Sequence, residues 1–133
     1  MEEQTFKSIL NTNLLPLAFI GDSVHTLFVR EFVLNMPNRK IENYHTLASY
    51  YCKASSQAKV LELLQEQLTE EEKEIVRRGR NAKPKHNAKN ASSAEYCHAT
   101  AFEVLIGFLH LSGNTERLKE ILNLSVKLIE KGK

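Results

Sequence analysis

The segment that decides the fold is L-L-P-L-A-F-I-G-D-S-V-H-T-L-F-V-R-E-F-V-L, residues Leu14–Leu34, the longest apolar region of the chain. Asn13 can cap a helix that begins here, and Pro16 falls in its first turn, where the missing N–H costs little. Asn35 and Pro37 follow the segment and are typical of a helix end. Polar and charged side chains interrupt the segment, so no apolar run approaches the ~20 residues needed to cross a bilayer. The sequence therefore predicts a long helix and no membrane-spanning segment.

Helical periodicity continues through most of the remaining chain. Thr69 and Glu72 form a capping box that predicts a helix start, and Gly79 and Pro84 are expected to interrupt the helix that follows. Gly113 separates the last two helical patterns. The patterns cover Ile41 to Leu68 with room for a break, Thr69 to Val76, about Ala94 to Leu111, and about Thr115 to Lys131. Because no segment alternates with β-branched enrichment, we predict an all-α fold.

The composition fits one domain covering residues 1–133. Hydrophobic residues make up 42% of the chain and charged residues 26%, which is ordinary for a globular protein and argues against disorder. Cys52 and Cys97 lie far apart and form no C-x-x-C pair, so we expect free thiols and a reducing, cytoplasmic location. His98 beside Cys97 is a weak metal signal because no second pair of ligands accompanies it. The acidic, polar N-terminus is not a secretory signal.

Two acidic residues stand alone in the two most apolar helices. Asp22 is the only aspartate of the chain, and Glu103 is the only acid between Glu95 and Glu116. Residues three and four positions apart share a helix face. Small residues lie about one turn from each acid, namely Ala18 and Thr26 near Asp22 and Ala99, Thr100 and Gly107 near Glu103. If these small-residue faces pack together, the two carboxylates meet.

Two carboxylates forced together must share a proton or bind a cation. Oxygen ligands suit Mg²⁺, which is often held by one or two carboxylates plus substrate phosphates, and Mn²⁺ could substitute for it. The alternative is that each acid reaches water at a helix edge or pairs with Arg30, His25 or His98. We favour a metal site formed by Asp22 and Glu103, because both acids are solitary and both lie on small-residue faces.

A basic segment at about 77–90 separates these two helical regions. It carries six basic residues and no acid, whereas the rest of the chain has 12 basic and 16 acidic residues. The net charge of +2 is therefore the sum of an acidic body and one basic loop. Arginine and lysine neutralise phosphates, and amides bind sugars or base edges. No aromatic residue is interleaved, which favours a duplex over a stacked single strand. The predicted RNA contacts are Arg77, Arg78, Arg80, Asn81, Lys83, Lys85, Lys89 and Asn90. A solvated loop or a docking site for an acidic protein is the alternative.

Three motifs together resemble one enzyme family. F-I-G-D-S-V at Phe19–Val24 resembles the signature of the ribonuclease III endonuclease domain, and T-A-F-E-V-L-I-G at Thr100–Gly107 resembles its second motif. R-G-R-N-A-K at Arg78–Lys83 resembles the hallmark of the short branch of that family, Mini-ribonuclease III. Their order and spacing match from about Leu14 to Leu122. The combination is specific, whereas F-I-G-D alone would be weak.

The resemblance implies an all-α endonuclease domain that forms a homodimer and cleaves double-stranded RNA with Mg²⁺. Asp22 matches the signature aspartate and Glu103 the second-motif glutamate, so both would be catalytic metal ligands. In the short branch the substrate is precursor 23S ribosomal RNA, in a pre-ribosome context where a ribosomal protein could assist. The branch has no separate double-stranded-RNA-binding domain, and the basic loop would take its place. Ala18 and Thr100 stand where full-length relatives carry further acids, so we expect weak metal binding that RNA phosphates complete.

Some alternatives remain open at the level of sequence. The same fold could serve as a non-catalytic, ribosome-associated scaffold for double-stranded RNA, or as a helical protein-interaction module that uses the basic loop. His25 and His45 could belong to the core or lie beside the site. The apolar residues compatible with a dimer interface are Phe19, Ile20, Phe28 and Phe32.

Overall fold

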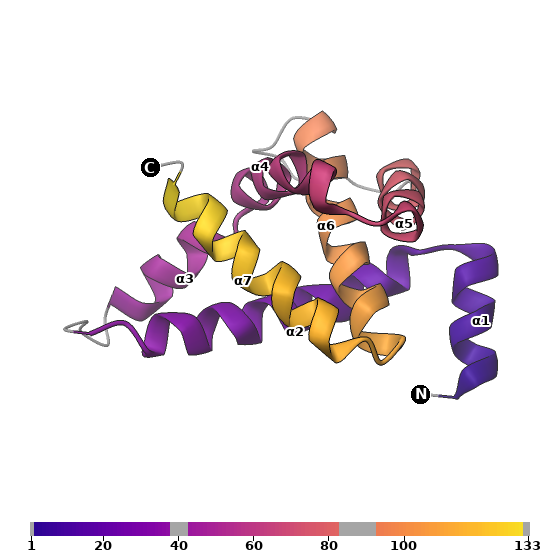
Figure 1. Cartoon of the computed structure of the whole chain (residues 1–133), viewed down its shortest axis with the longest axis horizontal. Coiled ribbons are helices and arrows are strands. Elements are labelled where there is room, and N and C mark those ends of the chain that lie inside the picture. Colours follow the sequence, from indigo (N-terminus) through magenta and orange to yellow (C-terminus); the bar gives the residue numbers. More distant parts are fainter. Residues whose placement is uncertain (1, 38–42, 83–92, 132–133) are drawn as a thin grey trace.

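The computed structural model describes residues 2–37, 43–82 and 93–131 (Figure 1). Within these ranges the chain forms seven α-helices, one 3₁₀-helix and no strand, which confirms the all-α prediction. None of these helices combines the length and apolar content needed to cross a membrane. The elements are α1 (Glu3–Thr12), α2 (Leu15–Leu34), α3 (Tyr44–Cys52), α4 (Ala54–Leu64), η2 (Gln65–Gln67), α5 (Glu70–Asn81), α6 (Ser93–Leu111) and α7 (Thr115–Lys131).

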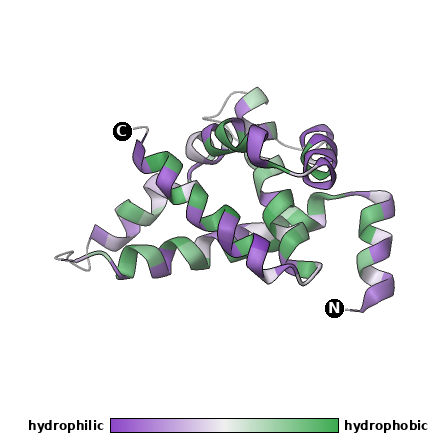
Figure 2. Cartoon of the chain, viewed as in Figure 1, coloured by the Kyte–Doolittle hydropathy of each residue, from purple (hydrophilic) through white to green (hydrophobic). Residues whose placement is uncertain are grey.

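Helix α6 lies at the centre of the fold. It packs against α2, α4 and α5, while α7 crosses in front of α2 and α6, and α1 stands beside the start of α2 (Figure 1). Apolar residues dominate both α2 and α6 (Figure 2). Every residue from Ala99 to Leu109 is buried except Glu103. Glu103, half-buried in the middle of this run, is therefore the only ionisable side chain between Ala99 and Leu109.

Two glycines let α2 and α6 cross with their backbones in contact. A Cβ added at Gly21 would lie 1.8 Å from the carbonyl oxygen of Glu103, and one added at Gly107 would lie 2.0 Å from that of Leu17. Real side chains do not tolerate such distances, so this crossing requires glycine on both helices. The contact brings together the two small-residue faces that the sequence identified.

Helix α5 differs from its sequence prediction. It continues through Gly79 to Asn81 instead of ending near Val76, so the predicted interruption at Gly79 is wrong. Gly79 is buried, and a Cβ there would lie 3.1 Å from the Cα of Ala101, so glycine here permits close packing of α5 on α6. The first part of the predicted basic loop is therefore helical, and residues 83–92, with the predicted break at Pro84, lie outside the described ranges.

The remaining boundaries follow the sequence closely, with one addition. Leu14, not the predicted Asn13, is the N-cap of α2; Asn13 lies one residue earlier, and its Oδ1 accepts a hydrogen bond from the Leu15 N–H at 3.0 Å. The long pattern ending at Leu68 resolves into α3, α4 and η2, with extended backbone at Lys53 between α3 and α4. Helix α1 was not predicted; it has no buried residue and rests on the core through Phe6, which stacks on Phe108 at 6.3 Å.

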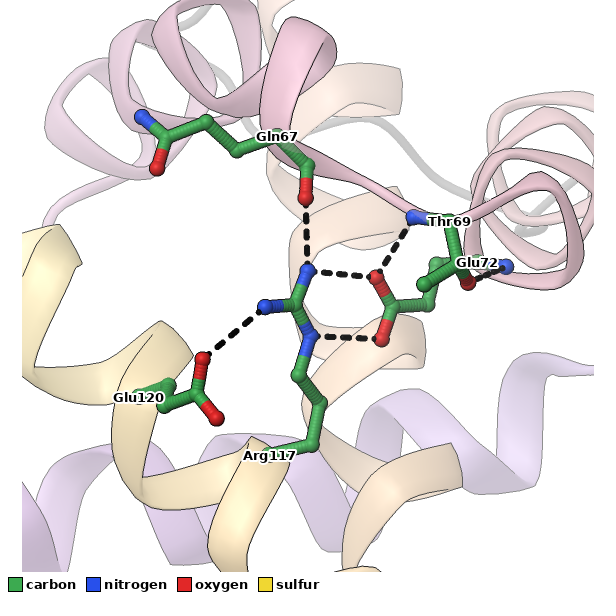
Figure 3. Close-up of polar contacts among 5 residues, drawn as sticks. All are labelled: Gln67, Thr69, Glu72, Arg117 and Glu120. Carbon is green, nitrogen blue, oxygen red and sulfur yellow. Dashed lines mark hydrogen bonds and ion pairs between the residues drawn. The ribbon is translucent and has the colours of Figure 1, made fainter.

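Hydrogen bonds and ion pairs of Arg117 link α7 to the start of α5 (Figure 3). The predicted capping box is present, since Thr69 Oγ1 accepts from the Glu72 N–H at 3.1 Å and Glu72 Oε1 accepts from the Thr69 N–H at 2.9 Å. Arg117 donates to both carboxylate oxygens of Glu72 at 2.8 Å and to the carbonyl of Gln67 at 2.7 Å. Burial favours the neutral acid, but the bonds from Arg117 and Thr69 hold the pKa of Glu72 below its usual value.

Candidate active site

Asp22 and Glu103 lie side by side where α2 crosses α6. Asp22 follows Gly21, which rests on the backbone of Glu103, and the two carboxyl groups share a hydrogen bond. Asp22 is exposed and Glu103 is half-buried, so the pair opens to solvent on the Asp22 side. The structure thus brings together the two acids that the sequence singled out.

The environment of Glu103 favours its protonated form. Burial, followed by the hydrogen bond and the charge of Asp22, raises the pKa of Glu103 to about 8, against an ordinary value of 4.5. At neutral pH the Glu103 carboxyl is therefore mostly protonated. None of the ion pairs among the described residues involves either acid, and the His98 ring bonds the carbonyl of Ala94 instead.

The donor set of this pair fits a hard divalent cation. Both groups offer carboxylate oxygens, and a cation that displaced their shared proton would relieve the repulsion between them. In the described part of the chain no three histidine, cysteine, aspartate or glutamate side chains come close enough to form a larger metal cluster. A cation held by Asp22 and Glu103 would therefore take its other ligands from water or substrate, as Mg²⁺ does readily.

Two buried polar residues lie on the inner side of Glu103. The Gln57 amide of α4 bonds the Glu103 carboxyl, and Gln57 Nε2 lies 3.1 Å from Nδ1 of His25 on α2. The His25 ring also meets Phe102 edge-on, with ring centroids 5.0 Å apart. Burial lowers the pKa of His25 to about 4 despite the opposing charge of Asp22, so the ring is neutral at pH 7.

Gln57 is the site residue that sequence analysis missed. It is 5% exposed and shares the inward face of α4 with Val60, Leu61 and Leu64. The available signal was a glutamine at helical spacing on an otherwise apolar face. The Cys52 thiol also borders the site through its hydrogen bond with Thr26, and burial raises its pKa, so the thiol stays protonated.

The described part of the predicted RNA surface is the C-terminal end of α5. Arg77 is exposed and pairs with Glu74, with Nε at 2.9 Å from a carboxylate oxygen. Arg78 is half-buried and donates to the carbonyl of Leu10 in α1. Arg80 lines a cleft of about 940 Å³ that Lys59 of α4 and Glu95 and His98 of α6 also line.

One further predicted RNA contact lies in a second cleft, and the others lie outside the described residues. Asn81 lines a cleft of about 210 Å³ together with Arg77 and Arg78, beside the junction of α1 and α2. The predicted contacts beyond α5 lie outside the described residues, namely Lys83, Lys85, Lys89 and Asn90. The structure therefore places four of the predicted RNA-binding residues on one helix end, and two of the arginines already have protein partners.

The family model of the ribonuclease III domain matches residues 15–114. This chain belongs to the ribonuclease III family. The match spans α2 to α6 and contains Asp22, Gln57 and Glu103, whereas α1 and α7 lie beyond it. The carboxylate pair thus lies inside the family's domain, and the chain is a ribonuclease III-type endoribonuclease.

Individual relatives agree with this assignment to the ribonuclease III family. The chain is 43% identical over 126 residues to Mini-ribonuclease 3 of Thermoanaerobacter sp., covering 95% of this chain and 89% of that protein. It is 38% identical over 131 residues to Mini-ribonuclease 3 of Staphylococcus aureus, covering 97% and 98%. The crystal structure of protein FN1578 from Fusobacterium nucleatum superposes with a TM-score of 0.80 at 29% identity, covering 90% of this chain and 95% of that one.

Proposed function

We propose that this chain is a Mg²⁺-dependent endoribonuclease that cleaves double-stranded RNA at the Asp22–Glu103 pair. The observation that carries the proposal is the hydrogen bond between these two carboxyls within the ribonuclease III domain, with Asp22 exposed to solvent. When bound, the metal supplies an activated water and neutralises charge on the phosphate. Asp22 and Glu103 would hold it, and Glu103 would give up its proton to do so.

Only two acids serve this proposed site. By resemblance to full-length ribonuclease III, Ala18 and Thr100 stand at positions where that enzyme carries further acids. Thr100 is also buried. With two protein ligands, the metal would bind weakly alone and more tightly once an RNA phosphate contributes oxygens. We therefore expect millimolar rather than micromolar demand for Mg²⁺, with Mn²⁺ able to substitute.

We propose that the basic end of α5, Arg77 to Asn81, together with Lys83, Lys85, Lys89 and Asn90, contacts the RNA backbone. The charges there would neutralise phosphates of a duplex without reading its sequence. The resemblance to the Mini-ribonuclease III branch makes precursor 23S ribosomal RNA, in the bacterial cytoplasm and in a ribosome-assembly context, the substrate we would test first. Steep weakening of duplex binding with added salt is the expected signature.

We also propose that the chain acts as a homodimer through the outer face of α2. Three large apolar side chains on this helix are exposed: Phe19 at 76%, Leu27 at 61% and Leu34 at 62%. Their spacing of eight and seven residues places them along one face. Of the residues compatible with an interface from sequence, Phe28 and Phe32 instead pack against the core. A second copy would cover this face, and each subunit would supply one carboxylate pair.

Cleavage of a duplex with and without Mg²⁺ tests the catalytic proposal. Wild type should cut only with metal, Asp22→Asn and Glu103→Gln should lose at least 100-fold in rate, and the exposed control Glu116→Gln should keep it. Duplex binding without metal should survive in both site variants. Binding without any cleavage by wild type would support the scaffold instead, and unchanged cleavage by Asp22→Asn would refute the assigned site.

A further inference from the structure

From the buried contacts behind the carboxylate pair, we infer that Gln57 is a positioning residue that fixes the Glu103 carboxyl for metal binding. The inference rests on the proposed function, because it concerns how the same site is held in place. Gln57 comes from α4, a third helix besides the two that carry the acids. It therefore adds a contact from a third helix to the Glu103 carboxyl.

The direction of the Gln57 amide is set by His25. The ring is 1% exposed and neutral, so its Nδ1 can accept the hydrogen bond that Gln57 Nε2 donates at 3.1 Å. Edge-on contact with Phe102 holds the ring in place. In the ring tautomer that carries its proton on Nε2, Nδ1 is an acceptor, so a flipped amide would turn its oxygen toward another acceptor.

With this orientation, the second N–H of Nε2 is available to Glu103. The amide hydrogen bond to the carboxyl favours its ionised form, which opposes the effects of burial and of Asp22. A donor of this kind orients a metal ligand. In metal sites generally, loss of such a supporting contact costs about 10–100-fold in metal affinity or activity.

The chain of contacts from His25 through Gln57 to Glu103 is buried at His25 and Gln57. Gln57 is 5% exposed, and no buried side-chain nitrogen or oxygen among the described residues lacks a partner. Burying an amide and an imidazole costs free energy unless they are hydrogen-bonded, and here Gln57 and His25 bond to each other. Here the chain of contacts leads from the core to Glu103.

The test replaces Gln57 by methionine, which is also unbranched and of similar length but cannot donate. We expect Gln57→Met to raise the Mg²⁺ concentration for half-maximal cleavage by about 10-fold or more, with a rate that recovers at high Mg²⁺. Mn²⁺ binding to the RNA-free protein, followed by electron paramagnetic resonance, should weaken by a similar factor. Gln57→Leu repeats both measurements with a second apolar side chain.

Ser125→Ala is the matched control, because Ser125 is fully buried and bonds only the carbonyl of Leu122 in its own helix. The control should keep wild-type metal dependence even where it lowers stability. Half-maximal Mg²⁺ and Mn²⁺ affinity within 2-fold of wild type in folded Gln57 variants would overturn the inference, as would an equal shift in Ser125→Ala. If wild type itself shows no metal-dependent cleavage, the proposed function fails instead, and the two failures are distinct.

Discussion

Gly21→Ala should separate the two helices that form the site. The new Cβ would lie 1.8 Å from the carbonyl oxygen of Glu103, whereas nonbonded heavy atoms settle at about 3.5–4 Å. Because the atom in the way is backbone, α2 and α6 must move apart by roughly 2 Å. Overpacking costs about 3 kcal/mol in a severe case, and alanine regains about 1 kcal/mol of helix propensity. We expect a net loss of about 2 kcal/mol or more.

Thermal and denaturant unfolding measure this loss directly. For a chain of this size, 2 kcal/mol corresponds to a fall in Tm of roughly 6–10 °C. A displacement of about 1 Å at a reacting group can also cost about 100-fold in rate, so cleavage should fall more than the unfolded fraction explains.

Gly79→Ala is the matched comparison for Gly21→Ala. It adds the same methyl group toward α6, but the closest atoms are 3.1 Å away, so neighbours need to yield by only a few tenths of an ångström. Its Tm should stay near that of wild type, because the propensity gain of about 1 kcal/mol offsets the tight contact. A Gly21→Ala protein as stable as Gly79→Ala would show that the backbone contact of α2 and α6 is not as close as described.

Further predictions concern the other features of the fold. Arg117→Met should lower the free energy of unfolding in urea by about 3 kcal/mol at pH 7, because it leaves Glu72 buried without its cation. The difference from wild type should shrink below pH 4.5 as Glu72 takes up a proton. An equal difference at pH 3 would contradict this assignment. Because the folded state keeps a proton on Glu103 that the unfolded state releases, the metal-free protein should lose stability as pH rises from about 4.5 to about 8, and Glu103→Gln should remove that slope. Over the upper part of this range, cleavage at limiting Mg²⁺ should increase with pH. Leu27→Glu should sediment as a monomer where wild type sediments as a dimer, and a dimer in both would place the interface elsewhere.

Much of the fold could be predicted because its signals are local. The capping box at Thr69 marks a helix start that the structure confirms, and Asn13 marks the start of α2 to within one residue. The interruption at Gly79 was wrong because glycine has two uses, and only the packing of α5 on α6 shows that close approach applies here. Helix α1 escaped prediction because it buries no residue and depends on contacts with distant helices.

Part of the candidate site could likewise be predicted from sequence, and part could not. Asp22 and Glu103 could be paired from sequence because each is a solitary acid on a face of small residues, and small faces permit close crossing. Gln57 could not be added, since a single glutamine on an apolar helix face does not say which residue across the core it meets. Only the packing of α4 on α6, with the contact of Gln57 to His25 of α2, relates it to Glu103.

With Asp22 and Glu103 as the proposed catalytic pair, the crossing of α2 and α6 also sets when activity can begin during synthesis. Asp22 and Glu103 are roughly 80 positions apart in the chain, so a nascent polypeptide carries the first acid long before the second is made. Neither acid has its partner until α6 has left the ribosome and packed against α2. On that proposal the enzyme would be inert as an incomplete chain, and the RNA around its own synthesis would meet only the folded enzyme.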